Sequence, residues 1–210
     1  MDKNRFEILE KQINRTVDAL RKNNFDAHYV KNVKELFKKL DEMVADGASC
    51  TVGGSMTLFE AGVIEYIKSR KIQYIDRYAE NADPVQVYRD ALHADYYFTS
   101  SNAITQAGEL YNMDGNGNRV AAIVYGPKKV IVIAGSNKIV KDLEAAVKRN
   151  REIAAPANAV RLNKDLPCGN TGVCTDCRSP GRFCCHELIS HYQQNKDRIA
   201  VLILPDSYGY

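Results

Sequence analysis

The chain has 210 residues, of which 45% are hydrophobic and 26% are charged, and its formal net charge is +3. These values are ordinary for one globular domain with a substantial buried core. The charges are mixed along the chain without a basic block, which argues against a nucleic-acid partner. No run approaches the roughly 18 apolar residues of a membrane span, and the charged N-terminus lacks the apolar centre of a signal peptide. We therefore expect a cytoplasmic protein.

The first 46 residues predict two helices around one short strand. Apolar residues recur at helical spacing over 4–22 and again over 32–45, where Asn32 is a candidate N-cap. FDAHYV, between the two helices, is short enough to be a strand. We expect this N-terminal helical segment to pack on an α/β core.

Residues 47–155 alternate between short apolar runs and helical patterns. We expect strands at 48–52, 71–77, 95–100, 120–126 and 128–135. We expect helices over 57–69, from Pro84 onward and over 138–153 with Asn137 as the cap, a helix or tight turn at 102–110, and a turn cluster at 111–119. The alternation predicts an α/β fold of three layers, an open and mostly parallel sheet between two layers of helices. Because Gly126-Pro127 is suited to close a hairpin, we expect the sheet to be mixed.

Residues 156–210 complete the chain. The stretch 156–185 has no periodicity and is rich in Cys, Gly, Pro and Asn. A short helix near 185–195 and a final strand, RIAVLILP at 198–205, follow it. We expect the segments 1–46, 47–155 and 156–210 to form one domain.

Turns rich in Gly, Ser, Thr or Asn follow several of the predicted strands. They are residues 53–57, 99–105, 126–129 and 134–138. Ligands of an open α/β sheet bind beyond the carboxyl ends of its strands, so these turns predict a shared pocket for a small anionic ligand. Glu60, one turn into the following helix, is the candidate nucleophile or acid–base residue. Backbone geometry alone also explains each turn. Three lysines would add positive charge: Lys128, Lys129 and Lys138.

The stretch PCGNTGVCTDCRSPGRFCC, residues 167–185, holds five of the six cysteines. Thiolates are soft ligands, and the spacing C-x5-C-x2-C-x6-C suits one metal centre held by four of them. Zinc sites usually show two Cys-x2-Cys pairs and this stretch has one, so we favour an iron–sulfur cluster over zinc. Cys185 or His186 is an alternative fourth ligand, and free or disulfide-bonded thiols are the alternative to a metal. The expected ligands are Cys168, Cys174, Cys177 and Cys184.

Three parts of the sequence together resemble the LUD-domain family, a lactate-utilisation family that was formerly a domain of unknown function. They are VGGSMTLFEAG (52–62), the string from TSSNAITQAGEL to GSNKIV (99–140), and AAPANAVRL with the cysteine stretch. The resemblance runs from about residue 10 to the end. It implies a fold of the ribose-phosphate isomerase and CoA-transferase type.

The resemblance also implies a link to lactate oxidation through iron–sulfur or flavin redox partner proteins. One function that follows is an accessory protein of lactate or organic-acid oxidation. The alternative is an isomerase or CoA-transferase-like enzyme, or a ligand-binding protein, with a purely structural metal site; Glu60 would then attack an acyl group. A sensor role and a homodimer stay open, as does whether the chain is an enzyme. The implied pocket residues are Gly53, Gly54, Ser55, Thr57, Glu60, Ser100, Asn102, Ala103, Thr105, Gly108, Gly126, Pro127, Lys128 and Asn137.

Overall fold

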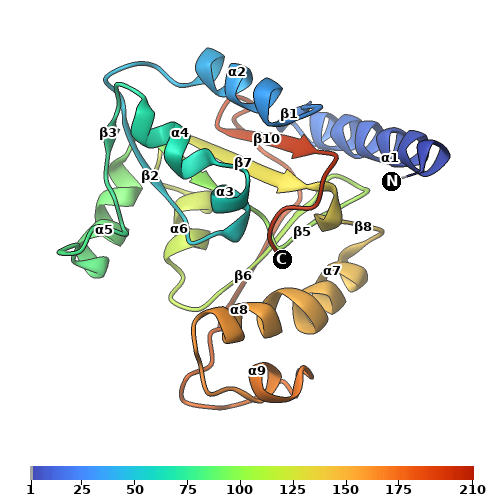
Figure 1. Ribbon diagram of the computed structural model, residues 1–210, viewed down its shortest axis with the longest axis vertical. Helices are drawn as coiled ribbons and strands as arrows, with labels where there is room; N and C mark the ends of the chain where they lie inside the picture. The colour runs from blue at the N-terminus through green and yellow to red at the C-terminus, as the bar shows by residue number, and fades with distance from the viewer. Residues whose placement is uncertain (1) are drawn as a thin grey trace.

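The computed structural model describes residues 2–210 and builds an α/β fold on two sheets (Figure 1). The helices are α1 (Lys3–Lys22), α2 (Val33–Met43), α3 (Met56–Glu60), α4 (Val63–Ser69), α5 (Pro84–Asp90), α6 (Asn118–Val124), α7 (Leu143–Arg149), α8 (Ala155–Arg161) and α9 (Pro167–Thr171). The strands are β1 (Asp26–Tyr29), β2 (Ser49–Val52), β3 (Gln73–Tyr74), β4 (Tyr96–Thr99), β5 (Ala103–Thr105), β6 (Leu110–Asp114), β7 (Lys129–Gly135), β8 (Ile139–Val140), β9 (His186–Ser190) and β10 (Ile199–Leu204).

The central sheet has the strand order β1-β10-β7-β4-β2-β3, and every neighbouring pair is parallel. Its middle strands, β7 and β10, are apolar and buried almost throughout, as is typical of a parallel sheet covered on both faces. The first and last parts of the chain join this sheet through β1 and β10, beside strands from the middle of the chain.

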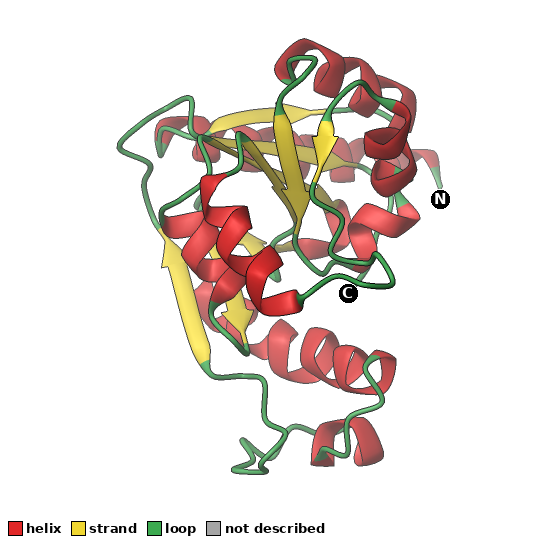
Figure 2. Cartoon of the chain, turned by 90° about the vertical axis from the view of Figure 1, so that its left-hand side faces the viewer, coloured by secondary structure: helices red, strands yellow, loops and turns green. Residues whose placement is uncertain are grey.

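Helices cover both faces of the central sheet, as Figure 2 shows. Alternate residues of β7 point to opposite faces: Val130 and Val132 pack with α1 and α6, whereas Ile131 and Ile133 pack with α2, α3 and α4. The three-layer α/β arrangement expected from the alternating pattern is therefore confirmed.

A second, smaller sheet has the order β8-β5-β6-β9 and lies beside α7. Its β5–β8 pair is parallel, whereas β5–β6 and β6–β9 are antiparallel. The chain of helices α7, α8 and α9 extends from this sheet toward the end of the molecule farthest from α2 in Figure 1. All antiparallel pairing thus lies outside the central sheet.

Several local signals in the sequence are confirmed. Strands lie where the runs at 25–30, 48–52, 95–100, 128–135 and 198–205 predict them. The side chain of Asn32 caps α2 by accepting a 3.0 Å hydrogen bond from the Glu35 N–H. The helix expected over 57–69 is present as α3 and α4, which separate at Gly62, where φ is +68°.

The prediction of a strand at 120–126 was wrong, because these residues form most of α6. The Asp114 carboxylate accepts hydrogen bonds from the backbone N–H groups of Arg119 (2.9 Å) and Val120 (3.1 Å). It thus provides an acceptor for N–H groups at the start of this helix, which have no partner within the helix. The hairpin at Gly126-Pro127 does not form either. A short apolar run fits a helix or a strand equally well, and here the preceding carboxylate favours the helix.

Four more regions differ from the expectation in whole or in part. Of the helix or tight turn expected at 102–110, the structure has the turn: β5 and β6 pair across Gly108, where φ is +82°. The helix expected at 185–195 is β9, which pairs with β6. The helix expected from residue 138 begins at Leu143, because Asp142 caps it through the Ala145 N–H (2.9 Å), and it continues through a π turn into α8. The expected strand at 71–77 shrinks to the two residues of β3.

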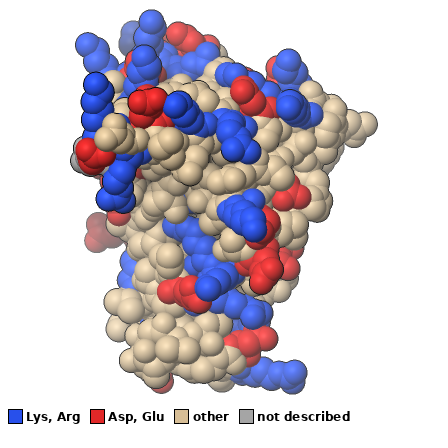
Figure 3. Space-filling model, turned by 90° about the vertical axis from the view of Figure 1, so that its right-hand side faces the viewer, with Lys and Arg blue, Asp and Glu red and all other residues tan. Residues whose placement is uncertain are grey.

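Surface charge is mixed on the face that Figure 3 shows, where Lys and Arg lie among Asp and Glu. No helix within residues 2–210 combines the length and the apolar character that crossing a membrane requires.

Candidate anion and metal sites

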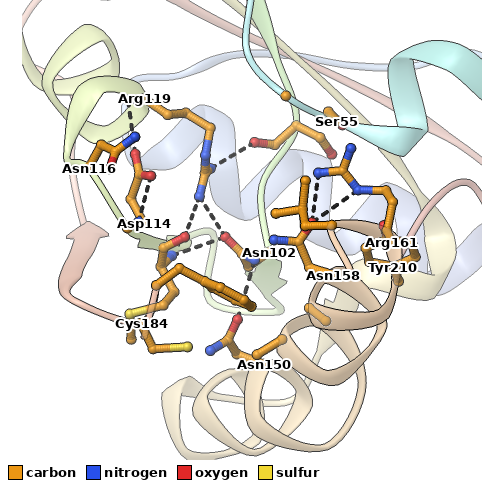
Figure 4. A pocket seen from close by; sticks show the side chains of 18 of the residues that line it. Ser55, Asn102, Asp114, Asn116, Arg119, Asn150, Asn158, Arg161, Cys184 and Tyr210 are labelled. Carbon is orange, nitrogen blue, oxygen red and sulfur yellow. Dashed lines mark hydrogen bonds between the residues drawn. The ribbon is translucent and has the colours of Figure 1, made fainter. Parts of the chain in front are cut away.

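A cavity of about 510 Å³ lies at the carboxyl edge of the central sheet (Figure 4). The neighbouring strands β7, β4 and β2 end beside it, and the residues that follow each of them contribute to its wall. The wall also includes residues from the end of β6 and the start of α6, from α8, and from residues 180–184 of the cysteine segment, together with Arg77 and Tyr210. An open α/β sheet is expected to bind its ligand at this edge.

The cavity wall is rich in positive charge. It contains six cationic side chains but only one acidic side chain, that of Asp114. The Asp114 carboxylate is itself engaged by the backbone N–H groups of Gly115, Arg119 and Val120. The six cations are Arg77, Arg119, Lys138, Arg161, Lys164 and Arg182.

Lys138 is the most buried of these cations, with 3% of its surface exposed. Its Nζ donates a 3.0 Å hydrogen bond to the Ser100 Oγ, and within residues 2–210 it forms no ion pair. Burial, together with the charges of Arg149 and Arg119, lowers the pKa of Lys138 to about 7, and the Glu60 carboxylate opposes that shift. A nearby anion would favour the charged form of this amine.

Arg119 is held rigidly by acceptors of the protein. Its guanidinium donates to the Met113 carbonyl (2.6 Å) and to the Asn102 Oδ1 (2.9 Å). With its oxygen occupied in this way, Asn102 directs its amide nitrogen toward the Asn150 Oδ1 at 3.3 Å. Burial lowers the pKa of Arg119. Arg119 therefore contributes a fixed positive charge and orients a polar side chain of the cavity.

Arg161 and Tyr210 lie across the cavity from Arg119 (Figure 4). Arg161, on α8, donates hydrogen bonds of 2.7 and 3.1 Å to the Asn158 Oδ1. The hydroxyl of Tyr210 is buried beside Arg161, and its O–H has no acceptor in the part of the chain that the structure describes. This side of the cavity therefore retains donors that a ligand can engage.

Arg77 lies beside the glycine turn after β2. Its guanidinium carbon is 5.4 Å from the ring centre of Tyr78 and 5.3 Å from that of Tyr88, distances at which cation–π attraction operates. A Cβ built on Gly54 would lie 3.5 Å from an Arg77 nitrogen. The missing side chain at Gly54 thus leaves this guanidinium close to the backbone of the turn.

Four of the pocket residues expected from the sequence line this cavity: Gly54, Ser55, Ser100 and Asn102. Gly53 lies directly behind them. A Cβ on Gly53 would come within 2.9 Å of the Tyr97 hydroxyl, so this position has no room for a side chain.

Three other expected residues hold the C-terminal tail and do not line the cavity. The Glu60 carboxylate accepts a 2.6 Å hydrogen bond from the Gly209 N–H. Thr57 and Asn137 donate to carbonyl oxygens of the tail at 3.0 and 2.9 Å. These contacts position the tail that brings Tyr210 to the cavity.

The remaining expected residues lie elsewhere. Gly126, Pro127 and Lys128 precede β7, so they lie at the amino edge of the sheet, where the Lys128 Nζ pairs with Asp95 at 2.7 Å. Their placement in the pocket depended on the strand wrongly assigned at 120–126. Three others belong to β5 and the turn after it, away from the cavity: Ala103, Thr105 and Gly108.

Sequence reasoning named Lys138 as a source of charge but missed Arg77, Arg119, Arg161 and Tyr210. No local signal marks them, because charged residues make up 26% of the chain and are spread along it. They meet only through the fold.

The four cysteines expected as metal ligands line a second cavity of about 50 Å³. Burial and the neighbouring Cys174 raise the pKa of Cys184 to about 11, whereas hydrogen bonds from Ser179 lower the pKa of Cys177. Cys185 is exposed and does not line this cavity, which favours Cys184 as the fourth ligand. Cys50 is buried in the central sheet.

Arg182 links three residues of the cysteine segment through hydrogen bonds and an ion pair. Its guanidinium donates to the carbonyl oxygens of Cys177 (2.5 Å) and Cys184 (2.8 Å) and pairs with the Asp176 carboxylate at 2.9 Å. Arg182 and Cys184 line both cavities. The larger cavity of about 510 Å³ and the cysteine cavity therefore share a wall.

The thiols fit a metal centre by their chemistry. Four soft donors line one small cavity, and zinc and iron–sulfur clusters both take ligands of this kind. Among residues 2–210, however, no three His, Cys, Asp or Glu side chains are arranged to hold one metal ion.

The parallel sheet with a cavity at its strand ends defines an α/β protein of the open-sheet class. The model of the LUD domain matches residues 13–204, and the chain therefore belongs to the LUD-domain family. A search of curated proteins finds no match.

Among solved structures, the chain is similar to a DUF162 family protein from Deinococcus radiodurans. The TM-score is 0.53 and the identity 12%, over 93% of this chain and 98% of that one. At this identity the similarity supports the shared fold.

Proposed function

We propose that this protein is an accessory protein in the oxidation of lactate or another organic acid. It binds a small anionic ligand in the larger cavity and holds an iron–sulfur or zinc centre with Cys168, Cys174, Cys177 and Cys184. Membership of the LUD-domain family supports the metabolic context. Iron–sulfur or flavin proteins are the proposed redox partners.

The observation that carries the proposal is the environment of Lys138. A buried ammonium without a carboxylate partner is costly, and here Arg119 and Arg149 add charge of the same sign. A bound anion offsets that cost. The position at the carboxyl edge of the sheet supports a ligand there.

The cysteine cavity supports the metal centre through its donor set. An iron–sulfur cluster would supply electron transfer, whereas a structural zinc would only stabilise the segment. We favour the cluster because the segment has a single Cys-x2-Cys pair. The shared wall would bring a bound ligand close to either centre.

The alternative, a transferase-like enzyme with Glu60 as nucleophile, has less support. The Glu60 carboxylate is engaged by the Gly209 N–H, and Glu60 is not part of the cavity wall. Under our proposal Glu60→Gln retains ligand binding. Loss of acyl-transfer activity in a Glu60→Gln variant that still folds and binds its ligand would favour the alternative.

The metal is tested by purifying the chain without oxygen, recording its absorbance spectrum, and assaying iron, sulfide and zinc. Broad visible absorbance with matching iron and sulfide supports the cluster. A colourless protein with zinc supports a structural site. Protein free of both metals, after expression with iron and zinc supplied, contradicts the metal centre.

A further inference from the structure

The positive charge of the larger cavity exceeds what a hydroxy-acid monoanion requires. We infer that the ligand of this cavity carries a phosphoryl group and at least two negative charges, and that unphosphorylated lactate is not the molecule recognised there. This inference rests on the proposed anion site and specifies the class of its ligand.

The charges of the wall do not cancel. Arg182 is paired with Asp176, which leaves five cations without an ion pair in residues 2–210. Against them stands a single acidic side chain, that of Asp114. One carboxylate ligand would leave most of this charge uncompensated, whereas a phosphoryl group brings about 1.5 to 2 negative charges at neutral pH. The five are Arg77, Arg119, Lys138, Arg161 and Lys164.

Unused hydrogen-bond donors point to the same class of ligand. An ammonium has three N–H donors, and Lys138 uses one, toward Ser100. Arg161 donates from Nε and Nη2 to Asn158 and interacts with the Tyr210 hydroxyl, whose own O–H has no acceptor among the described residues. A phosphoryl group offers three terminal oxygens to such donors, whereas a carboxylate offers two.

The deep end of the cavity is the place for the phosphoryl group. Lys138 and Ser100 meet there, Arg119 adds its charge, and burial strengthens every electrostatic interaction. Arg161, across the cavity in Figure 4, would face the rest of the ligand.

The size of the cavity agrees with a ligand larger than a three-carbon acid. Its volume of about 510 Å³ lies within the roughly 300–1,000 Å³ of pockets that hold drug-sized molecules.

The test compares two acids that differ only by the phosphoryl group, L-lactate and 2-phospho-L-lactate, with inorganic phosphate as a third probe. Binding to the full chain is measured by calorimetry at fixed ionic strength. We expect 2-phospho-L-lactate to bind at least about tenfold more tightly than L-lactate, because a charge-assisted hydrogen bond contributes that much.

Two variants locate the binding. Lys138→Gln and Arg161→Gln should each weaken binding of 2-phospho-L-lactate by about ten- to a hundredfold. Lys128→Gln, at the opposite edge of the sheet, is the matched control and should bind like the parent. Arg161 lies on the exposed surface of α8, so its variant should fold even if Lys138→Gln does not.

The outcomes separate this inference from the proposed anion site. L-Lactate that binds as tightly as its phosphorylated form, and that is weakened by Arg161→Gln, overturns the inference and leaves the anion site intact. If none of the three probes binds, both are overturned. Tight binding of the phosphorylated acid that neither cavity variant weakens also overturns the inference, because the site then lies elsewhere.

Discussion

The ammonium nitrogen of Lys138 lies 3.0 Å from the hydroxyl oxygen of Ser100. The two residues are 38 positions apart in the chain, and they meet because β4 and β7 are neighbouring parallel strands whose carboxyl ends lie side by side. This pairing places a buried cation where an open α/β sheet binds its ligand.

A first prediction concerns stability. The pKa of Lys138 is about 7 in the folded protein, below its ordinary value of 10.5, so the unfolded chain binds more protons between these pH values. The loss of stability caused by burying the charged amine is fully present below the folded-state pKa, and it disappears as pH rises through the ordinary value. Without ligand, Lys138→Met should therefore be more stable near pH 6 by about 2–4 kcal/mol.

Urea unfolding of parent and variant across the pH range from acidic to alkaline measures this difference. The increase in the free energy of unfolding of Lys138→Met over the parent should become smaller as pH rises. Lys128→Met, which removes an exposed ion pair, should change stability by less than about 1 kcal/mol. A gain from Lys138→Met that is the same at every pH would show that Lys138 is not desolvated in the folded protein.

Much of the fold could be predicted from the sequence, since the strongest strands and the two N-terminal helices carry clear apolar patterns. The failed prediction at 120–126 has an identifiable cause. VAAIVYG fits a strand locally, and only the Asp114 carboxylate, which reaches forward to the N–H groups of Arg119 and Val120, begins a helix there. Because of this error, Lys128 was expected in the pocket, although it lies at the amino edge of the sheet.

The candidate site, too, could be predicted only in part. Gly54 and Ser100 could be found because small residues after strands have a recognised role. Arg161 could not, since it reaches the cavity only through α8 and the way that helix packs against the rest of the fold. The cysteines were identifiable from spacing alone, because metal ligation favours short separations.

A second prediction distinguishes the neighbouring cysteines. Cys184 lines the cysteine cavity and Cys185 does not. Cys184→Ser should lose most of the bound metal, whereas Cys185→Ser should retain it, as measured by metal content and the absorbance spectrum. Equal loss in the two variants, or loss only in Cys185→Ser, would show that the fourth ligand is misassigned.

A third prediction concerns Arg182, which joins the carbonyl groups of Cys177 and Cys184. Arg182→Gln should lower metal affinity by about 10- to 100-fold, as the loss of groups that position ligands usually does. It should also speed proteolysis within residues 172–185. Arg178→Gln changes a nearby arginine for which no ion pair is observed within residues 2–210, and it is the matched control. Identical behaviour of the two variants would rule out this role for Arg182.

The most direct test of the anion site is calorimetry with sulfate, a dianion whose charge is constant near neutral pH. Lys138 faces the Ser100 hydroxyl, the cations Arg119 and Arg149, and the Glu60 carboxylate. At a pH about one unit above the pKa of Lys138, bound sulfate should charge the amine, so binding should take up protons. Comparing binding enthalpies in buffers of different ionisation enthalpy measures that uptake.

Sulfate should bind with proton uptake to the parent chain and to Lys128→Gln. In Lys138→Gln, binding should be weaker and the uptake should be absent. Sulfate that binds Lys138→Gln as tightly as the parent, with the same proton uptake, would contradict the central claim that Lys138 forms the base of an anion site.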